Sequence, residues 1–353
     1  MPKRRTKLGG LKRRHSRVVS PRMHVDPVGA RYRLGHRQGH YESWFIRGNH
    51  PTRPRAFWVR YTVTSPKNRP EDAVAELFAA LFDGETKRHV ATRQAFPVSQ
   101  GQFPTDTLGV RIADARLEPD HLTGAIERGG ERVAWDVRVH DGGPPLYLFP
   151  ENLYAGGFPK AKALVMRTNV TFGGHFDVAG ERLAVDGWVG STNHNWGSKH
   201  TDHYVWGQVA GFDDAPGTFL ELATARIKLA GVMTPPMTPI VLRHDGREFR
   251  LNALHTLFGR ATARGLDWSF RARGKELELV GRIHSQPSDC VVFMYQDPPG
   301  GWKWCINSKI AACELELVVG GRRKFLKSAS RAAMELFVHD PRAEGLINLP
   351  QPI

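Results

Sequence analysis

From Tyr32 onward, most of the chain alternates apolar and polar side chains with a period of two residues. Residues 57–63 read Phe-Trp-Val-Arg-Tyr-Thr-Val, and residues 133–139 read Val-Ala-Trp-Asp-Val-Arg-Val. Similar segments lie at 108–117, 164–172, 203–212, 219–231, 248–257, 266–272, 275–284, 290–296 and 312–319. Clusters of Gly, Pro and Asp separate them, as at 141–145 and 297–301. Many short strands joined by such turns predict an all-β protein, an antiparallel sandwich or barrel.

Two segments do not follow this pattern clearly. Residues 72–82 fit a helix and a strand equally well, because short apolar runs do not separate the two. In residues 325–337 the apolar side chains of Phe325, Ala329, Ala332 and Leu336 recur at helical spacing. We therefore expect a C-terminal helix there, with a last strand as the alternative.

Size and composition indicate a globular protein. The chain has 353 residues, of which 41% are hydrophobic and 24% charged, and this length is enough for two domains. No apolar run approaches the roughly 20 residues of a membrane-spanning helix. Cys290, Cys305 and Cys313 lack metal-ligand spacing, and their odd number argues against a disulfide framework. We therefore expect a reducing, cytoplasmic compartment.

The positive charge is concentrated at the N-terminus. Residues 1–22 hold nine Lys and Arg residues and no acid, which leaves +6 of the net +15 for the rest of the chain. Such an arm suits nucleic acid or an anionic membrane surface. Nothing downstream supports nucleic-acid binding, so we expect a disordered tail, or a true start at Met23. Peripheral membrane contact stays open, and the sequence does not define an oligomeric state.

The segment from Gly190 to Gly197, Gly-Ser-Thr-Asn-His-Asn-Trp-Gly, concentrates polar and aromatic groups. His200, Tyr204 and Trp206 follow it closely. Imidazole and carboxamide groups beside large aromatic faces are typical of the wall of a pocket for a mostly apolar molecule with one polar end.

Two predicted strands would extend this wall. Tyr204, Trp206 and Gln208 share one face of the strand at 203–212, and an aromatic core patch is the alternative. In the strand from Phe219, Glu221 is the only charge on the face without Lys or Arg. A carboxyl in apolar surroundings keeps its proton to higher pH and becomes a general-acid candidate. A structural ion pair with an inward Arg or His explains Glu221 equally well.

Other chemistry has less support. His194, His200, Asp202 and His203 are metal-ligand types, but their spacing matches no known metal-ligand motif, so we predict no metal. The sequence has no Gly-x-Ser-x-Gly elbow, no P-loop and no strand–GxGxxG–helix unit. We therefore predict an enzyme or binding protein that uses no cofactor.

Four segments together resemble the AttH/CrtC-like superfamily, which includes hydroxyneurosporene synthase (carotenoid 1,2-hydratase), with tocopherol cyclase as a more distant relative. The Gly190–Gly197 segment with His200 and Trp206 is similar to the superfamily's His-Asn-Trp-Gly signature, and residues 41–45, Tyr-Glu-Ser-Trp-Phe, to its Glu-Trp-Trp-Tyr motif. Residues 159–162 and 305–309 resemble two further blocks. The resemblance runs from about Tyr41 to Leu317.

The resemblance implies two lipocalin-like β domains, which we place at 23–200 and 201–345, with a hydrophobic cavity near their junction. It further implies cofactor-free hydration, cyclisation or dehydration of isoprenoid-like or other apolar molecules. His194-Asn195-Trp196 matches a His-x-Trp pair that lines the cavity. Phe219-Leu220-Glu221 matches an aromatic-x-acid pair approximately, and Asn193 replaces an acid.

These residues make one catalytic hypothesis. Protonated Glu221 donates a proton to an alkene or a leaving oxygen, and Trp196, Trp206 and Phe219 stabilise the carbocation-like state. His194 positions the closing water or hydroxyl, and Glu42 is a second acid candidate if it points into the cavity. We expect Glu42, Trp44, Asn195, Tyr204, Trp206, Gln208 and Phe219 to bind the ligand.

Two alternatives do without a reaction. The cavity could serve a carrier for a hydrophobic ligand, in which Glu42, His194 and Glu221 fix its polar head or satisfy one another. The interior could also be filled, in which case Trp44, Trp196 and Trp206 would pack fully on one another.

Overall fold

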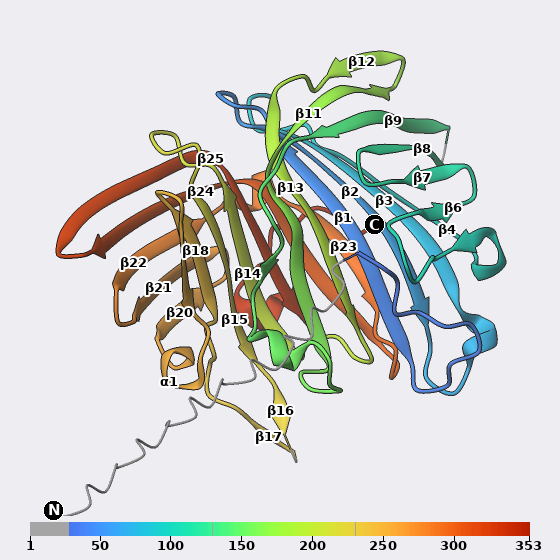
Figure 1. Cartoon of the computed structure of the whole chain (residues 1–353). Coiled ribbons are helices and arrows are strands. Elements are labelled where there is room, and N and C mark those ends of the chain that lie inside the picture. The colour runs from blue at the N-terminus through green and yellow to red at the C-terminus, as the bar shows by residue number, and fades with distance from the viewer. Residues whose placement is uncertain (1–27, 129, 230) are drawn as a thin grey trace, which may run out of the picture.

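A computed structural model describes residues 28–128, 130–229 and 231–353, so the basic arm at 1–22 lies outside the described residues. The protein is nearly all β, with two large antiparallel sheets and few short helical turns (Figure 1), which confirms the predicted fold class. In the described residues, the hydrogen-bonded order of each sheet runs between two end strands and does not close on itself. No helix in the described part of the chain is long and apolar enough to span a bilayer.

The first sheet holds thirteen strands, and its main path runs β4-β3-β2-β1-β13-β11-β9-β8-β7-β6-β5, while β10 and β12 pair with β11. Its strands are β1 (His40–Asn49), β2 (Arg55–Ser65), β3 (Val74–Asp83), β4 (Val90–Pro97), β5 (Gly101–Gln102), β6 (Val110–Ile112), β7 (Ala115–Leu117), β8 (His121–Arg128), β9 (Glu131–His140), β10 (Leu146–Tyr147), β11 (Ala161–Val178), β12 (Glu181–Ala184) and β13 (Trp188–Gly197).

The second sheet holds ten strands in the order β19-β18-β15-β14-β25-β24-β22-β21-β20, with β23 paired to β24, and a separate hairpin joins β16 to β17. These strands are β14 (His203–Ala210), β15 (Phe219–Arg226), β16 (Lys228–Leu229), β17 (Val232–Met233), β18 (Ile240–His244), β19 (Arg247–Leu251), β20 (Arg260–Arg264), β21 (Asp267–Arg273), β22 (Leu277–His284), β23 (Val291–Gln296), β24 (Trp302–Val319) and β25 (Arg322–Val338).

The helical elements are all short. Within residues 28–128, 130–229 and 231–353 there is one α-helical turn, α1 (Leu254–Leu257), and the 3-10 turns are η1 (Pro70–Asp72), η2 (Val98–Gln100), η3 (Glu151–Leu153), η4 (Pro287–Asp289) and η5 (Pro341–Glu344). The ambiguous segment 72–82 is mainly the strand β3.

The expected C-terminal helix at 325–337 is wrong, because this segment lies inside β25, which pairs with β24. The register between the two strands shifts around Ala311, opposite Ala332. Before the shift, buried and exposed residues alternate in β25, and from Arg331 to Met334 four consecutive residues are buried. A change in burial pattern within a strand thus produces apolar spacing that resembles a helical period.

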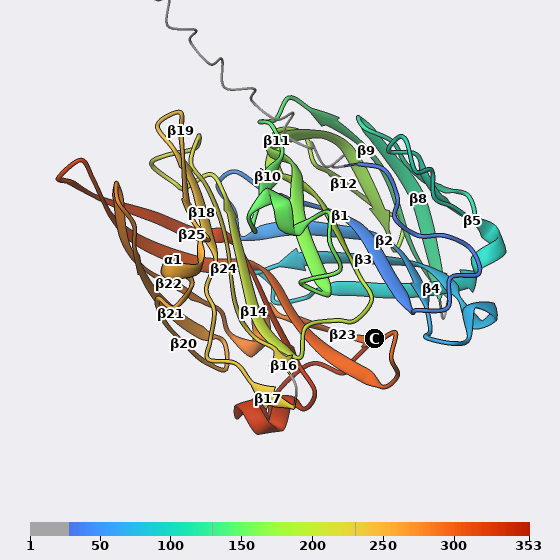
Figure 2. The same ribbon diagram turned by 60° about the horizontal axis from the view of Figure 1, so that its bottom comes forward.

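Each sheet curves around a core of its own, and a third apolar cluster lies between the sheets. Inside the first sheet, the Tyr61 hydroxyl on β2 donates toward the carbonyl groups of Arg116 and Thr123 on the far side, at 2.8 and 3.0 Å. The third cluster joins Phe45, Trp58 and Phe78 of the first sheet to residues of the second, including Trp206 and Phe293. In both views the sheets stand side by side (Figures 1 and 2). Strands β1, β2, β3, β13 and β14 are therefore covered on both faces.

Candidate functional site

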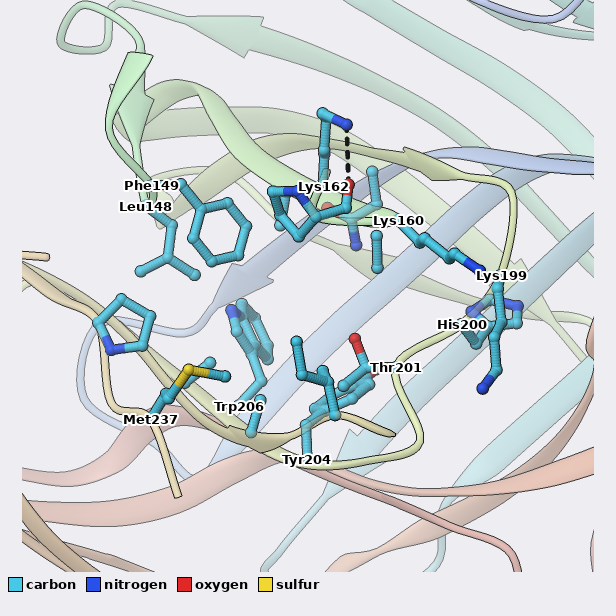
Figure 3. A pocket seen from close by; sticks show the side chains of 18 of the residues that line it. Leu148, Phe149, Lys160, Lys162, Lys199, His200, Thr201, Tyr204, Trp206 and Met237 are labelled. Atoms are coloured by element: carbon cyan, nitrogen blue, oxygen red, sulfur yellow. Dashed lines mark hydrogen bonds between the residues drawn. The ribbon is translucent and has the colours of Figure 1, made fainter. Parts of the chain in front are cut away.

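A cavity of about 280 Å³ lies at the junction of the two sheets. Its wall takes side chains from β1, β2 and β13 of the first sheet and from β14, β15 and β25 of the second, together with the loops at 148–160 and 199–202. Figure 3 shows Leu148, Phe149 and Met237 toward one end and Lys199 and His200 at the other, with Trp206 and Tyr204 between. The cavity therefore has an apolar end and a basic end.

The aromatic part of the wall follows from strand alternation on β14. Tyr204 and Trp206 share the face toward the first sheet, while Val205 and Val209 point into the core of the second. Gly207 lies on the core face, where an added Cβ would approach Trp268 within 2.9 Å. Close packing behind β14 therefore fixes the position of Trp206 and Tyr204 at the cavity.

His200 belongs to the basic end. Its ring stacks on Tyr41 with a centroid distance of 3.8 Å, and it is 8% exposed. Burial lowers the pKa of His200 well below its usual range, and the nearby charges of Arg60 and Lys303 lower it further, while a hydrogen bond to the backbone of Gln296 acts in the opposite direction. The ring is therefore neutral, and the nitrogen that does not bond Gln296 keeps its lone pair.

Arg60 on β2 lies on the same wall although it is 7% exposed. Its guanidinium lies 4.3 Å from the ring centroid of Tyr295 and 5.6 Å from that of Phe78. The Nε atom is buried without a hydrogen-bond partner. Arg60 therefore places a positive charge between the two sheets, although β2 lies in the middle of the first sheet.

Glu221 on β15 lies directly behind the Trp206 indole. Its carboxylate accepts hydrogen bonds from Trp206 Nε1 and Gln208 Nε2, both at 2.8 Å. Burial raises the pKa of Glu221 to about 7, although these two bonds and the charge of Arg47 oppose the rise. Since Glu221 is not itself among the residues on the cavity wall, its carboxyl reaches the cavity only through the indole.

The contact continues as a polar chain between the sheets. Gln208 Nε2 also donates to Asn193 Oδ1 at 2.9 Å, and Gln208 Oε1 accepts from Ser191 at 2.6 Å. All three side chains are 1% exposed or less. A fully bonded network in a buried layer fixes how two sheets meet, because each unmade bond would carry its desolvation penalty.

Glu42 and His194 form a different cluster, on the opposite face of the first sheet. Glu42 accepts from His194 Nε2 at 2.8 Å, from His40 Nε2 at 3.0 Å and from the backbone amide groups of Arg31 and Tyr32. Burial raises the pKa of Glu42, but the hydrogen bonds from His194 and His40 outweigh it and bring the pKa to about 2. Glu42 is thus an ionised anchor for the chain at 31–32, and it does not lie on the wall of the junction cavity, where it would have to be to act as a second acid.

The tryptophans predicted with His194 belong to the same cluster. The His194 ring stacks on Trp44 at 4.9 Å and meets Trp196 at 4.7 Å, and all three are buried in the core of the first sheet. The side chains of His194 and Trp196 lie on one face of β13, and the side chain of Asn195 lies on the opposite face. Glu42, Trp44, His194 and Trp196 therefore do not lie on the wall of the junction cavity, which is on the Asn195 face of β13.

The remaining predicted residues differ in whether they lie on the cavity wall or behind it. Asn195, Tyr204 and Trp206 line the cavity as predicted. Gln208 lies behind the wall with Glu221, and Phe219 packs in a separate apolar cluster with Leu146 and Val165. Phe219 therefore does not lie on the wall of this cavity.

The described residues contain no group of three His, Cys, Asp or Glu side chains arranged to hold a metal ion. The four residues considered for this role diverge. His194 bonds Glu42, His200 stacks on Tyr41, Asp202 pairs with Lys199, and His203 pairs with Glu344 at 3.0 Å.

Arg60, Tyr41 and His200 were not predicted as ligand contacts. Alternation in residues 57–63 places Arg60 opposite the apolar set, which in a one-sided sheet means solvent, but β2 is covered on both faces. The sequence did contain an indication for His200, because this residue and Trp206 are part of the segment that resembles the superfamily signature.

Comparisons with known proteins support the same architecture. A crystal structure from Nitrosomonas europaea assigned as AttH covers 89% of this chain and 99% of its own, with 15% identity and a TM-score of 0.53. The crystal structure of CghA covers 86% of this chain and 88% of its own, with 12% identity and a TM-score of 0.55. CghA with Sch210972 covers 86% and 89%, with 12% identity and a TM-score of 0.52.

These likenesses confirm the AttH/CrtC-like resemblance at the level of the fold. No protein-family model matches the chain. No curated protein sequence matches it either.

Proposed function

We propose that this protein is a cofactor-free acid/base enzyme of the hydratase, cyclase or isomerase type, acting on an apolar molecule in the junction cavity. One observation carries the proposal: a neutral imidazole, His200, stands at the polar end of an otherwise mostly apolar cavity. A mostly apolar surface with a group at one end that can move a proton suits such an active site.

His200 is the proton-transferring group in this proposal. Its free nitrogen removes a proton from a carbon of the ligand, and the electron pair of the C–H bond forms a C=C bond. In a hydroxylated ligand the C–O bond breaks, and the same proton leaves with the hydroxyl group as water. Hydration is the reverse. In an isomerisation no group leaves: the electron pair of the C–H bond forms the new C=C bond, an adjacent C=C bond shifts its electron pair to its far carbon, and that carbon takes up the proton. None of these reactions changes the overall oxidation state of the ligand, so none needs an oxidant or a reductant.

Glu221 acts through Trp206 in this scheme and is a positioning residue. Its bond to Trp206 Nε1 holds the indole against the cavity, and Gln208 holds Glu221 in turn. This replaces the sequence-based hypothesis of direct proton donation by Glu221, because both carboxyl oxygens already accept hydrogen bonds behind the wall.

A carrier for a hydrophobic ligand is the second candidate. The observation that favours it is the complete bonding of the buried polar groups nearest to Trp206, namely Glu221, Gln208 and Asn193. CghA, which shares the fold, has been solved with Sch210972, and this supports a ligand in this architecture for either candidate.

The test uses the full chain purified from its native host. An organic extract is analysed by mass spectrometry, and any stoichiometric molecule is returned to fresh protein in D₂O. We expect deuterium incorporation, or gain or loss of water, with the wild type. The same outcome is expected with His203→Gln, a matched control whose imidazole pairs with Glu344 away from the cavity.

His200→Gln should still bind the molecule and should lose the reaction. Turnover by His200→Gln at the wild-type rate would contradict the role of His200. A molecule that the wild type binds and releases unchanged, without deuterium, would replace the enzyme by the carrier.

A further inference from the structure

Arg60 is a buried cation at the cavity that has no acidic partner within 4.0 Å in the described residues. Three cations packed nearby do have one: Lys309 pairs with Glu335 at 2.6 Å, Arg93 with Glu76 at 2.7 Å and Lys303 with Asp297 at 3.3 Å. Arg47, a buried arginine on the same face of the first sheet, also has no acidic partner among the described residues, but its guanidinium donates to the carbonyl oxygen of Arg331. No Asp or Glu carboxylate in the described part of the chain lies within 4.0 Å of the Arg60 guanidinium. A buried charge left in this state is costly, because burial removes hydration that no ion pair replaces.

The acid whose charge acts on Arg60, Glu335, does not form an ion pair with it within 4.0 Å. Glu335 lines the cavity and acts on Arg60 at longer range, but its Oε1 atom already accepts from Lys309 Nζ at 2.6 Å and from Asn307 Nδ2 at 3.4 Å. The Glu335 carboxylate therefore compensates the charge of the buried Lys309 first, and it is not an ion-pair partner of Arg60.

The cavity as a whole carries excess positive charge. Its lining contains two acids, Asp202 and Glu335, against the five bases Arg60, Lys160, Lys162, Lys199 and Lys228. Asp202 is paired with Lys199. Lys162, which is 6% exposed, donates to the carbonyl of Pro159 at 2.8 Å, as the dashed line in Figure 3 shows. Such a lining favours an anion at the basic end.

We propose that the molecule held in the junction cavity is an amphipathic carboxylic acid, whose carboxylate binds Arg60 at the His200 end and whose apolar body extends past Trp206 toward Leu148 and Met237. A guanidinium presents a planar fork of donors that matches a carboxylate with two parallel hydrogen bonds. The guanidinium lies against the Tyr295 ring, 4.3 Å from its centroid, which helps to hold it in place.

This inference rests on the proposed function only in requiring the cavity to be a ligand site, and it holds for the enzyme and for the carrier. It narrows the ligand from any apolar molecule to those with an acidic head. It also places the head beside His200, so that the carbon atoms next to the carboxylate are the ones within reach of the imidazole.

Isothermal titration of the full chain with decanoate, decanol, methyl decanoate and decyl phosphate tests the proposal. We expect decanoate to bind roughly tenfold to a hundredfold more tightly than decanol or the methyl ester, the range of a hydrogen bond to a charged group. Arg60→Gln should remove this preference and leave decanol binding unchanged, and Arg60→Lys should keep part of it.

Arg47→Gln is the matched control, because Arg47 is fully buried on the same inter-sheet face, also has an unbonded Nε, and is not a cavity residue. It should keep the decanoate preference. If Arg60→Gln does not fold, the wild-type comparison of decanoate with its methyl ester and the Arg60→Lys variant decide the question.

Equal binding of decanoate and decanol to the wild type would overturn the acidic head while keeping the cavity as a ligand site. Tighter binding of decyl phosphate than of decanoate would replace the carboxylate by a phosphate. Binding of none of the four probes would refute the cavity as a ligand site, and with it the proposed function.

Discussion

Replacing Glu221 by glutamine should change how the stability of the protein depends on pH. Glu221 is 2% exposed, and burial raises its pKa from an ordinary 4.5 to about 7. Between these two values the unfolded chain ionises this carboxyl while the folded protein keeps it protonated. The stability that Glu221 contributes is therefore fully present below pH 4.5 and is lost as the pH rises through about 7.

The two pKa values set the size of the effect. Their separation corresponds to about 3 kcal/mol of folding free energy between roughly pH 4 and pH 8. The glutamine amide does not titrate, so the variant lacks this change. It also has an offset independent of pH, because its amide must face one of the two donors, Trp206 Nε1 or Gln208 Nε2. The pKa of Glu221 is therefore tested by how the difference in the free energy of unfolding changes with pH, and not by its absolute size.

Urea unfolding of both proteins, followed by circular dichroism in steps across this range, measures the difference. We expect the free energy of unfolding of the wild type to fall relative to Glu221→Gln as the pH rises from about 5 to about 7. A difference that stays constant, or that grows in favour of the wild type, would refute the raised pKa of Glu221 and the dry environment behind Trp206.

Two further predictions concern the first sheet. Although burial raises the pKa of Glu42, the hydrogen bonds from His194 and His40 outweigh this effect and bring the pKa to about 2, so wild-type stability should fall by about 3 kcal/mol relative to Glu42→Gln as the pH decreases from 4.5 to about 2; parallel acid-unfolding curves would contradict this. Gly190→Ala should destabilise by about 3 kcal/mol, since its Cβ would lie 1.9 Å from the carbonyl oxygen of Arg47. Gly217→Ala, with open space around its Cβ, should melt like the wild type, and equal melting of both variants would refute the steric argument.

Much of the fold could be predicted from the sequence, because strand alternation and turn residues are local signals. They were sufficient for most strands and for the all-β class. The segment at 325–337 failed because the register shift near Ala311 changes the burial pattern within β25, and register is a property of the pair of strands. The register of β25 depends on its pairing with β24, which a pattern within residues 325–337 does not contain.

The site was less predictable for a related reason. Alternation identifies the two faces of a strand, but it does not say what covers each face. His194 and Asn195 were assigned to one pocket although they point to opposite sides of β13, and Arg60 was overlooked because the second sheet covers its face of β2. Trp206 and Tyr204 were predicted correctly, since their face of β14 is the one that meets the cavity.

The central claim is that ligand binds in the cavity between the sheets and not around His194. Photo-crosslinking the full chain with a diazirine-bearing decanoic acid, followed by peptide mass spectrometry, tests it most directly. We predict labels on the junction wall, at Trp206, Met237 or Leu148, and their loss in the presence of excess decanoate. Competed labels on Trp44, His194 or Trp196 would contradict the account and place the site inside the first sheet.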